Sequence, residues 1–199
     1  MILNFIKRSI ILLCVIIPLL IIAFNGCSQY DYSSPTPGTL EVRLHSYYTQ
    51  FDTVFADNNF TLKVTRVYAV RSDGILANVY EDVKAVGPTP DIYNILGRDA
   101  YDSLLVIGLY PLPPADYLGL IVQIEPGPSV VLDGYRNIAV DRLPPPDYTT
   151  VVNIFAPFHI EEAKTTSLVI TADMDVTLKR LAYTFQYNPS YFVSSQKTY

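Results

Sequence analysis

The stretch that decides the fold class is residues 60–80, FTLKVTRVYAVRSDGILANVY. Phe60, Leu62 and Val64 alternate with polar residues, and this period of two places the three side chains on one face of a strand. Ser-Asp-Gly is a turn signal, so residues 75–80 are expected to pair back as the second strand of a hairpin. The stretch therefore predicts half-buried antiparallel sheet.

Short segments of the same kind occupy most of the chain on both sides of this hairpin. Turn and loop residues separate them, and no segment has the period of an amphipathic helix. About nine to eleven short strands at this spacing are typical of an antiparallel sandwich or barrel. The other segments expected to be strands are 40–44, 93–96, 103–109, 117–124, 130–132, 138–140, 149–155, 168–178 and 183–193.

Two of these segments are apolar runs that do not follow simple alternation. The apolar run 103–109 fits strand or helix, and Gly108 with Pro111 favours strand. The run 117–124 is almost continuously apolar, which predicts a strand buried on both faces.

The N-terminus has the three parts of an export signal. Lys7 and Arg8 are followed by the apolar run 9–24, and then by Asn-Gly-Cys ending at Cys27. A positive start, a short apolar core and a small residue at the cleavage site are typical of secretory signals. About 16 apolar residues are fewer than the roughly 20 that a spanning helix needs. Residues 1–26 are therefore predicted to be a signal peptide.

The segment 24–27, Phe-Asn-Gly-Cys, resembles the lipobox of bacterial lipoproteins, which fits at Gly26 and Cys27 and loosely at the two residues before them. The resemblance implies cleavage before Cys27 and lipidation of its thiol, with acylation of the new amine and a membrane as partner. Ser28 is not the aspartate associated with inner-membrane retention, so an outer membrane is expected. Two alternatives remain: an uncleaved N-terminal anchor helix, and a secretory signal cut elsewhere.

The remaining chain is expected to be a tether, 27–38, and one domain, 39–199. Cys14 leaves with the signal, so no cysteine pair remains for an internal disulfide. Losing Lys7 and Arg8 changes the formal charge from −5 to −7. This acidic balance argues against nucleic acid as a partner.

The second half of the chain resembles a family of bacterial lipoprotein domains of unknown function. Three segments carry the resemblance: Leu-Pro-Pro-Ala-Asp-Tyr at 112–117, Val-Leu-Asp-Gly at 131–134, and 157–176 with its late strand. The chain departs from the pattern at 114–116 and at Met174. The resemblance implies an immunoglobulin-like or prealbumin-like Greek-key sandwich in the cell envelope, and it brings no catalytic residues.

Four residues are candidates for metal binding. His45 and His159 are the only histidines, and a shared zinc site would need them close together with a third ligand. Asp173 and Asp175 are expected on one strand face, where paired carboxylates are weak calcium candidates. Solvated strand residues are the favoured interpretation of both pairs, and Asp-Asn-Asn at 57–59 is interpreted as a turn.

No catalytic motif is present, so we expect no enzyme and no cofactor. The leading hypothesis is a lipid-anchored, non-enzymatic module that binds or scaffolds another envelope component. The alternatives are a glycan-binding module and a subunit of a surface filament or adhesin. Tyrosines are the candidates for a binding surface, although strand propensity also accounts for them: Tyr47, Tyr48, Tyr68, Tyr80, Tyr183, Tyr187 and Tyr191.

Overall fold

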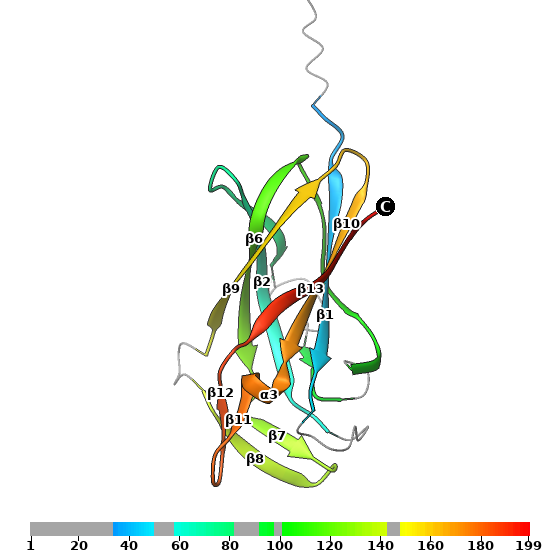
Figure 1. The fold of residues 1–199 in the computed structure, drawn as a ribbon. Helices are drawn as coiled ribbons and strands as arrows, with labels where there is room; N and C mark the ends of the chain where they lie inside the picture. The colour runs from blue at the N-terminus through cyan, green and yellow to red at the C-terminus, as the bar shows by residue number, and fades with distance from the viewer. Residues whose placement is uncertain (1–33, 50–57, 82–91, 98–100, 143–147) are drawn as a thin grey trace, which may run out of the picture. The chain divides into compact units, whose positions relative to one another are not determined.

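The computed structural model describes residues 34–49, 58–81, 92–97, 101–142 and 148–199. Pro35–Tyr199 forms one compact unit that is almost entirely β (Figure 1). The predicted all-β fold is therefore confirmed. In the described part of the chain, no helix has the length and apolar character needed to cross a membrane. The predicted signal peptide lies outside the described residues.

The first sheet has the strand order β13-β10-β1-β5. Its central strand β1 (Gly38–Tyr47) is antiparallel to β5 (Leu105–Leu112) but parallel to β10 (Thr165–Asp173). The edge strand β13 (Tyr191–Thr198) is antiparallel to β10. The parallel pair joins strands from opposite ends of the domain, so it needs no helical crossover.

The second sheet has the order β3-β2-β6-β9, and every pair in it is antiparallel. Its strands are β2 (Thr61–Arg71), β3 (Leu76–Glu81), β6 (Ala115–Pro126) and β9 (Thr150–Ile160), and β4 (Ile92–Asn94) pairs with the start of β2. The predicted hairpin at 60–80 is confirmed as β2 and β3. Gly74, with φ +85°, closes its turn.

A small third sheet has the order β11-β12-β8-β7 (Figure 1). Asp133 (φ +52°) and Gly134 (φ +74°) turn the chain between β7 (Ser129–Leu132) and β8 (Arg136–Asp141), which confirms the predicted hairpin. The remaining elements are the short helix α3 (Met174–Thr177), β11 (Leu178–Arg180) and β12 (Phe185–Tyr187).

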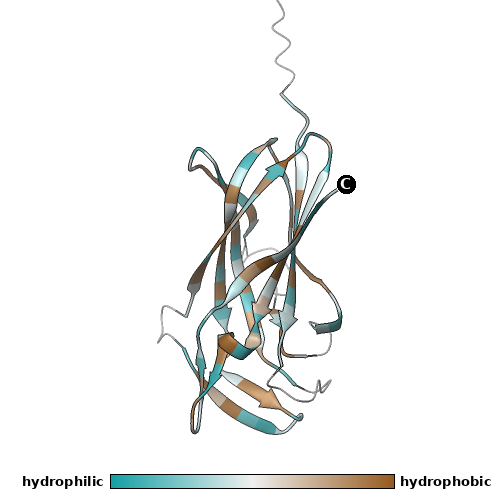
Figure 2. Ribbon diagram, viewed as in Figure 1, coloured by the Kyte–Doolittle hydropathy of each residue, from teal (hydrophilic) through white to brown (hydrophobic). Residues whose placement is uncertain are grey.

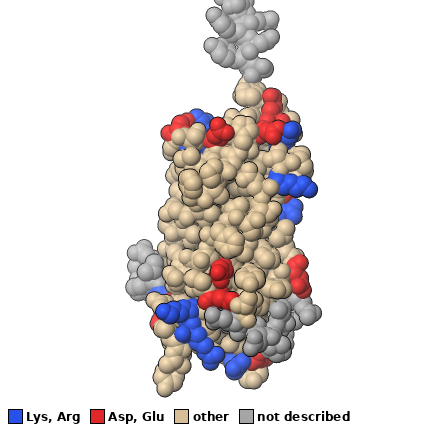
Figure 3. All heavy atoms as spheres, in the orientation of Figure 1, with Lys and Arg blue, Asp and Glu red and all other residues tan. Residues whose placement is uncertain are grey.

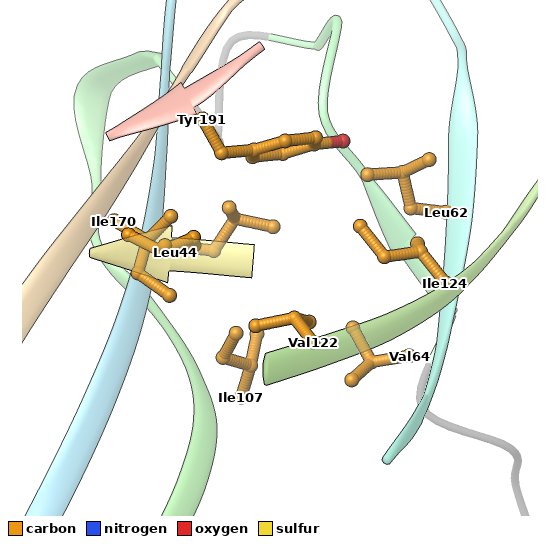
Figure 4. Close-up of a pocket in the computed structure, with 9 residues that line it drawn as sticks. Leu44, Leu62, Val64, Ile107, Val122, Ile124, Ile170 and Tyr191 are labelled. Atoms are coloured by element: carbon orange, nitrogen blue, oxygen red, sulfur yellow. The ribbon is translucent and has the colours of Figure 1, made fainter. Parts of the chain in front are cut away.

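Most of the core lies between the two larger sheets, and it continues into the small third sheet through residues such as Leu132 and Phe185. Hydropathy alternates along the strands of the larger sheets (Figure 2). Leu44, Ile170 and Tyr191 of the first sheet face Leu62 and Val122 of the second (Figure 4). The cavity between them is about 10 Å³ and its lining is apolar. A space of this size holds at most about one water, and a water needs polar partners. The centre of the sandwich is therefore packed core and no ligand pocket.

The predictions for the two apolar runs have different outcomes. Residues 105–112 form a strand, as Gly108 and Pro111 favoured. The prediction that 117–124 is buried on both faces is wrong. β6 buries Leu120 and its alternate neighbours, whereas Leu118 is 41% exposed. The run is apolar on both faces because its outer face is an exposed apolar surface.

Candidate functional site

The predicted lipidation site, Cys27, lies outside the described residues. The candidate sites within the described domain are the two histidines, the two aspartates and the tyrosines.

The two histidines lie in different sheets and have different partners. His45 on β1 contacts the backbone oxygen of Tyr101 through Nε2 at 3.1 Å. His159 on β9 contacts Asp116 on β6, with 2.7 Å between Nδ1 and Oδ1. Both side chains of the second pair are exposed. Across the described residues, no three His, Cys, Asp or Glu side chains group as metal ligands would. The structure thus does not assemble the hypothetical zinc site.

Asp173 and Asp175 do not share a strand face, so that expectation is wrong. β10 ends at Asp173, and residues 174–177 form a helical turn, to which the period of two does not apply. The Asp175 carboxylate accepts hydrogen bonds from the backbone N–H (2.8 Å) and the hydroxyl (2.5 Å) of Thr49. Asp175 therefore joins the segment that follows β1 to the helical turn.

The candidate tyrosines do not form one surface. Tyr48 is buried, and Tyr187 and Tyr191 share a hydrogen bond of 3.0 Å between their hydroxyls. Tyr47 is 46% exposed, and Tyr183, after β11, is 93% exposed. These side chains are thus divided between the core and the surface.

The motif at 112–117 has a packing role. The Tyr117 hydroxyl donates to the backbone oxygen of Pro113 at 3.0 Å. The Tyr117 ring stacks on Phe158, with centroids 5.1 Å apart and planes 6° apart. Desolvation by burial raises the Tyr117 pKa. Thr166, from the last motif segment, donates to the backbone oxygen of His159. The motif residues thus join the segment between β5 and β6 to β9 and β10.

Asn58, predicted to lie in a turn, is buried and forms hydrogen bonds with segments that are distant in the sequence. Its side-chain oxygen accepts from the backbone N–H of Asp133 at 2.9 Å, and its backbone oxygen accepts from the Asn94 side chain at 3.0 Å. Only 2% of Asn58 is exposed. It therefore links the β7–β8 turn to the start of β2 and to β4, a long-range role for which the local sequence carries no signal.

The outer face of the second sheet carries an apolar groove of about 270 Å³ around Gly119. The Phe155 side chain stands beside it and is 81% exposed. Gly119 has no side chain to fill the space, and a Cβ there would lie 2.1 Å from the Ile154 oxygen. The groove is lined by Val70, Leu118, Gly119, Leu120, Ile121, Asn153, Ile154 and Phe155.

Apart from Asn153, the side chains that line this groove are apolar. They offer no nucleophile, acid or base, so the groove is suited to binding an apolar surface. The sequence signals for it were the glycine inside the apolar run 117–124 and the alternation at 149–155. Comparison with known proteins finds no matching family model, no matching curated protein and no matching solved structure.

Proposed function

We propose that this chain is a lipid-anchored protein of the bacterial cell envelope, and that its β-sandwich is a non-enzymatic binding or scaffolding module. The observation that carries the anchor is the order of the N-terminal features: a positive start, an apolar run, and Gly26 before Cys27. Two or more acyl chains on Cys27 hold a protein stably at a membrane, where one chain is marginal.

The number of residues between Cys27 and the first strand limits how far the domain could stand from such an anchor. The first strand begins at Gly38, and the residues between include Pro35 and Pro37. A segment of this length spans at most about 35–40 Å when extended, at roughly 3.3–3.6 Å per residue. The tether would keep the domain close to the membrane surface.

The outer face of the second sheet supports the binding role. It exposes Phe155 and Leu118 beside the groove at Gly119, and exposed apolar patches of this kind mark interaction sites.

The test is detergent phase partition combined with labelling by an alkyne-bearing fatty acid in growing cells. The full chain is expected to enter the detergent phase and to carry the label. Cys27→Ala is expected to lose both properties, and Cys14→Ala serves as the matched control that keeps them. A Cys27→Ala chain that still carries label would disprove lipidation at this residue. Fractionation of the labelled membranes then tests the expected outer-membrane location.

A further inference from the structure

The exposed Phe155 side chain and the groove at Gly119 lie at the same level on neighbouring strands of the second sheet. Gly119 of β6 and Phe155 of β9 are directly paired in the register. Phe155 projects from the sheet with 81% of its surface exposed, and Gly119 leaves the adjacent position hollow. The face therefore presents one projection and one recess, a single strand spacing of about 4.8 Å apart.

We infer that this face binds a second copy of the same chain. The proposed two-fold axis runs parallel to the strands, midway between β6 and β9, and lies between the two copies. Rotation about it places β6 of one copy over β9 of the second copy and keeps every residue at the same level along the strands. It places Phe155 of one copy over Gly119 of the second copy, and the reverse contact follows from the same rotation. A two-fold interface needs such a self-complementary patch.

The charged residues at one end of the face fit the same rotation. Asp116 and His159 are also paired in the register of β6 and β9, and both side chains are exposed. The axis that matches Phe155 with Gly119 brings His159 of one copy to Asp116 of the second copy. The two side chains already contact each other within one copy, and the rotation sets each of them opposite its unlike partner in the second copy, so this end adds no direct contact between like groups.

The rest of β9 adds no charge to the contact. Its sequence, Thr150–Ile160, contains no Lys, Arg, Asp or Glu. Figure 3 shows that charged side chains on the face drawn gather mainly toward the two ends of the domain. A strand without Lys, Arg, Asp or Glu suits the buried centre of a protein interface, where charged residues are depleted.

The rotation keeps the strands of both copies pointing the same way. Gly38 then begins β1 at the same end in each copy, and two copies could be anchored in one membrane. This last point rests on the proposed lipid anchor, whereas the contact between the sheets does not.

The experiment uses the full chain in detergent, with two differently tagged forms expressed together, and measures co-purification and particle mass. The unsubstituted chain is expected to form dimers. Phe155→Asp places a charge at the centre of the contact and should weaken dimerisation by at least about tenfold, as loss of a central aromatic residue commonly does. Tyr183→Asp is the matched control, because Tyr183 is equally aromatic, is 93% exposed and lies in the turn between β11 and β12.

A monomeric unsubstituted chain at the highest concentration reached would overturn the inference, and would leave a glycan or a different apolar protein as the occupant. A dimer unaffected by Phe155→Asp would overturn it equally. Circular dichroism confirms that each variant is folded. Repeating the measurement with Cys27→Ala separates the two proposals, since the dimer should persist even if the anchor is lost or was never present.

The charged pair supplies a second test with its own control. Asp116→His removes the unlike pair from both contacts, places two histidines opposite each other and should weaken the dimer. Adding His159→Asp restores an unlike pair in every contact and should restore the dimer. Failure of the exchanged pair to restore it would contradict the proposed axis.

Discussion

Tyr117 and Pro113 are joined by a hydrogen bond of 3.0 Å from the tyrosine hydroxyl to the proline backbone oxygen, four residues earlier. The bond closes the segment between β5 and β6, while the tyrosine ring stacks on Phe158 of β9. One side chain thus holds a loop and a neighbouring strand together.

Removing this hydroxyl should destabilise the domain by about 1 kcal/mol, the usual net contribution of one hydrogen bond. Tyr117→Phe keeps the ring stack and deletes only the bond, and urea unfolding measures the change. Tyr110→Phe is the control, because Tyr110 lies on β5 with 49% of its surface exposed, and its effect should stay within about 0.5 kcal/mol. Equal effects of the two substitutions would contradict the role of the bond.

Substitution by alanine should lower the free energy of unfolding much more at Gly119 than at Gly74. At Gly119 a Cβ would lie 2.1 Å from the backbone oxygen of Ile154, so Gly119→Ala must displace β9 and should cost more than about 2 kcal/mol. At Gly74 the space is open and only the positive φ of +85° is unfavourable, so Gly74→Ala should cost about 1 kcal/mol. Chemical unfolding of both variants tests the order, and the reverse order would contradict the close approach.

The partly buried pair Tyr187 and Tyr191 should make the domain sensitive to alkali. Burial raises the pKa of Tyr187 to about 12 and raises that of Tyr191 well above its usual value of 10. A raised folded-state pKa gives a contribution to stability that is complete below pH about 10 and is lost as the pH rises through about 12. The unfolding free energy should therefore fall over this window. Tyr187→Phe should make the fall shallower, and an unchanged slope would contradict the assignment.

Loss of the Asn58 side chain should loosen one hairpin more than the rest of the domain. Asn58→Ala leaves the N–H of Asp133 without its acceptor and should cost about 1–3 kcal/mol. Hydrogen exchange should speed up in β7 and β8 and little elsewhere. Asn137→Ala, at an exposed position of β8, should leave the exchange unchanged. A uniform increase in the rate of hydrogen exchange across the domain would contradict a local role for Asn58.

The fold could be predicted where strand pairing is local. The β2–β3 and β7–β8 hairpins each carry their alternation and their turn residues within one short stretch. The parallel pairing of β1 with β10 has no such local signal, because its partners are at opposite ends of the domain. Glu41 shows the same limit. It lies between two apolar residues of β1, a pattern that predicts a solvated side chain. It is nevertheless only 9% exposed, and the distant Tyr199 donates to its carboxylate at 3.3 Å.

The candidate site was harder to predict than the fold. An apolar run is equally consistent with a strand buried on both faces and with one that exposes an apolar face, and for 117–124 the prediction of burial on both faces is wrong. The spacing of two residues also predicts one strand face for Asp173 and Asp175, and this is wrong because β10 ends at Asp173. The groove at Gly119 depends on which residue of β9 stands opposite the glycine, and register is a property of the folded sheet.

The parallel pair also sets an order of events during biogenesis. A chain that emerges from its N-terminus presents β1 first, but β1 reaches its position between β5 and β10 only after Thr165–Asp173 has followed. Contacts between such distant segments form late, because a long loop must close before they are gained. The first sheet can therefore be completed only after β10 and the C-terminal strand β13 have emerged, whereas every strand of the second sheet has emerged by Ile160.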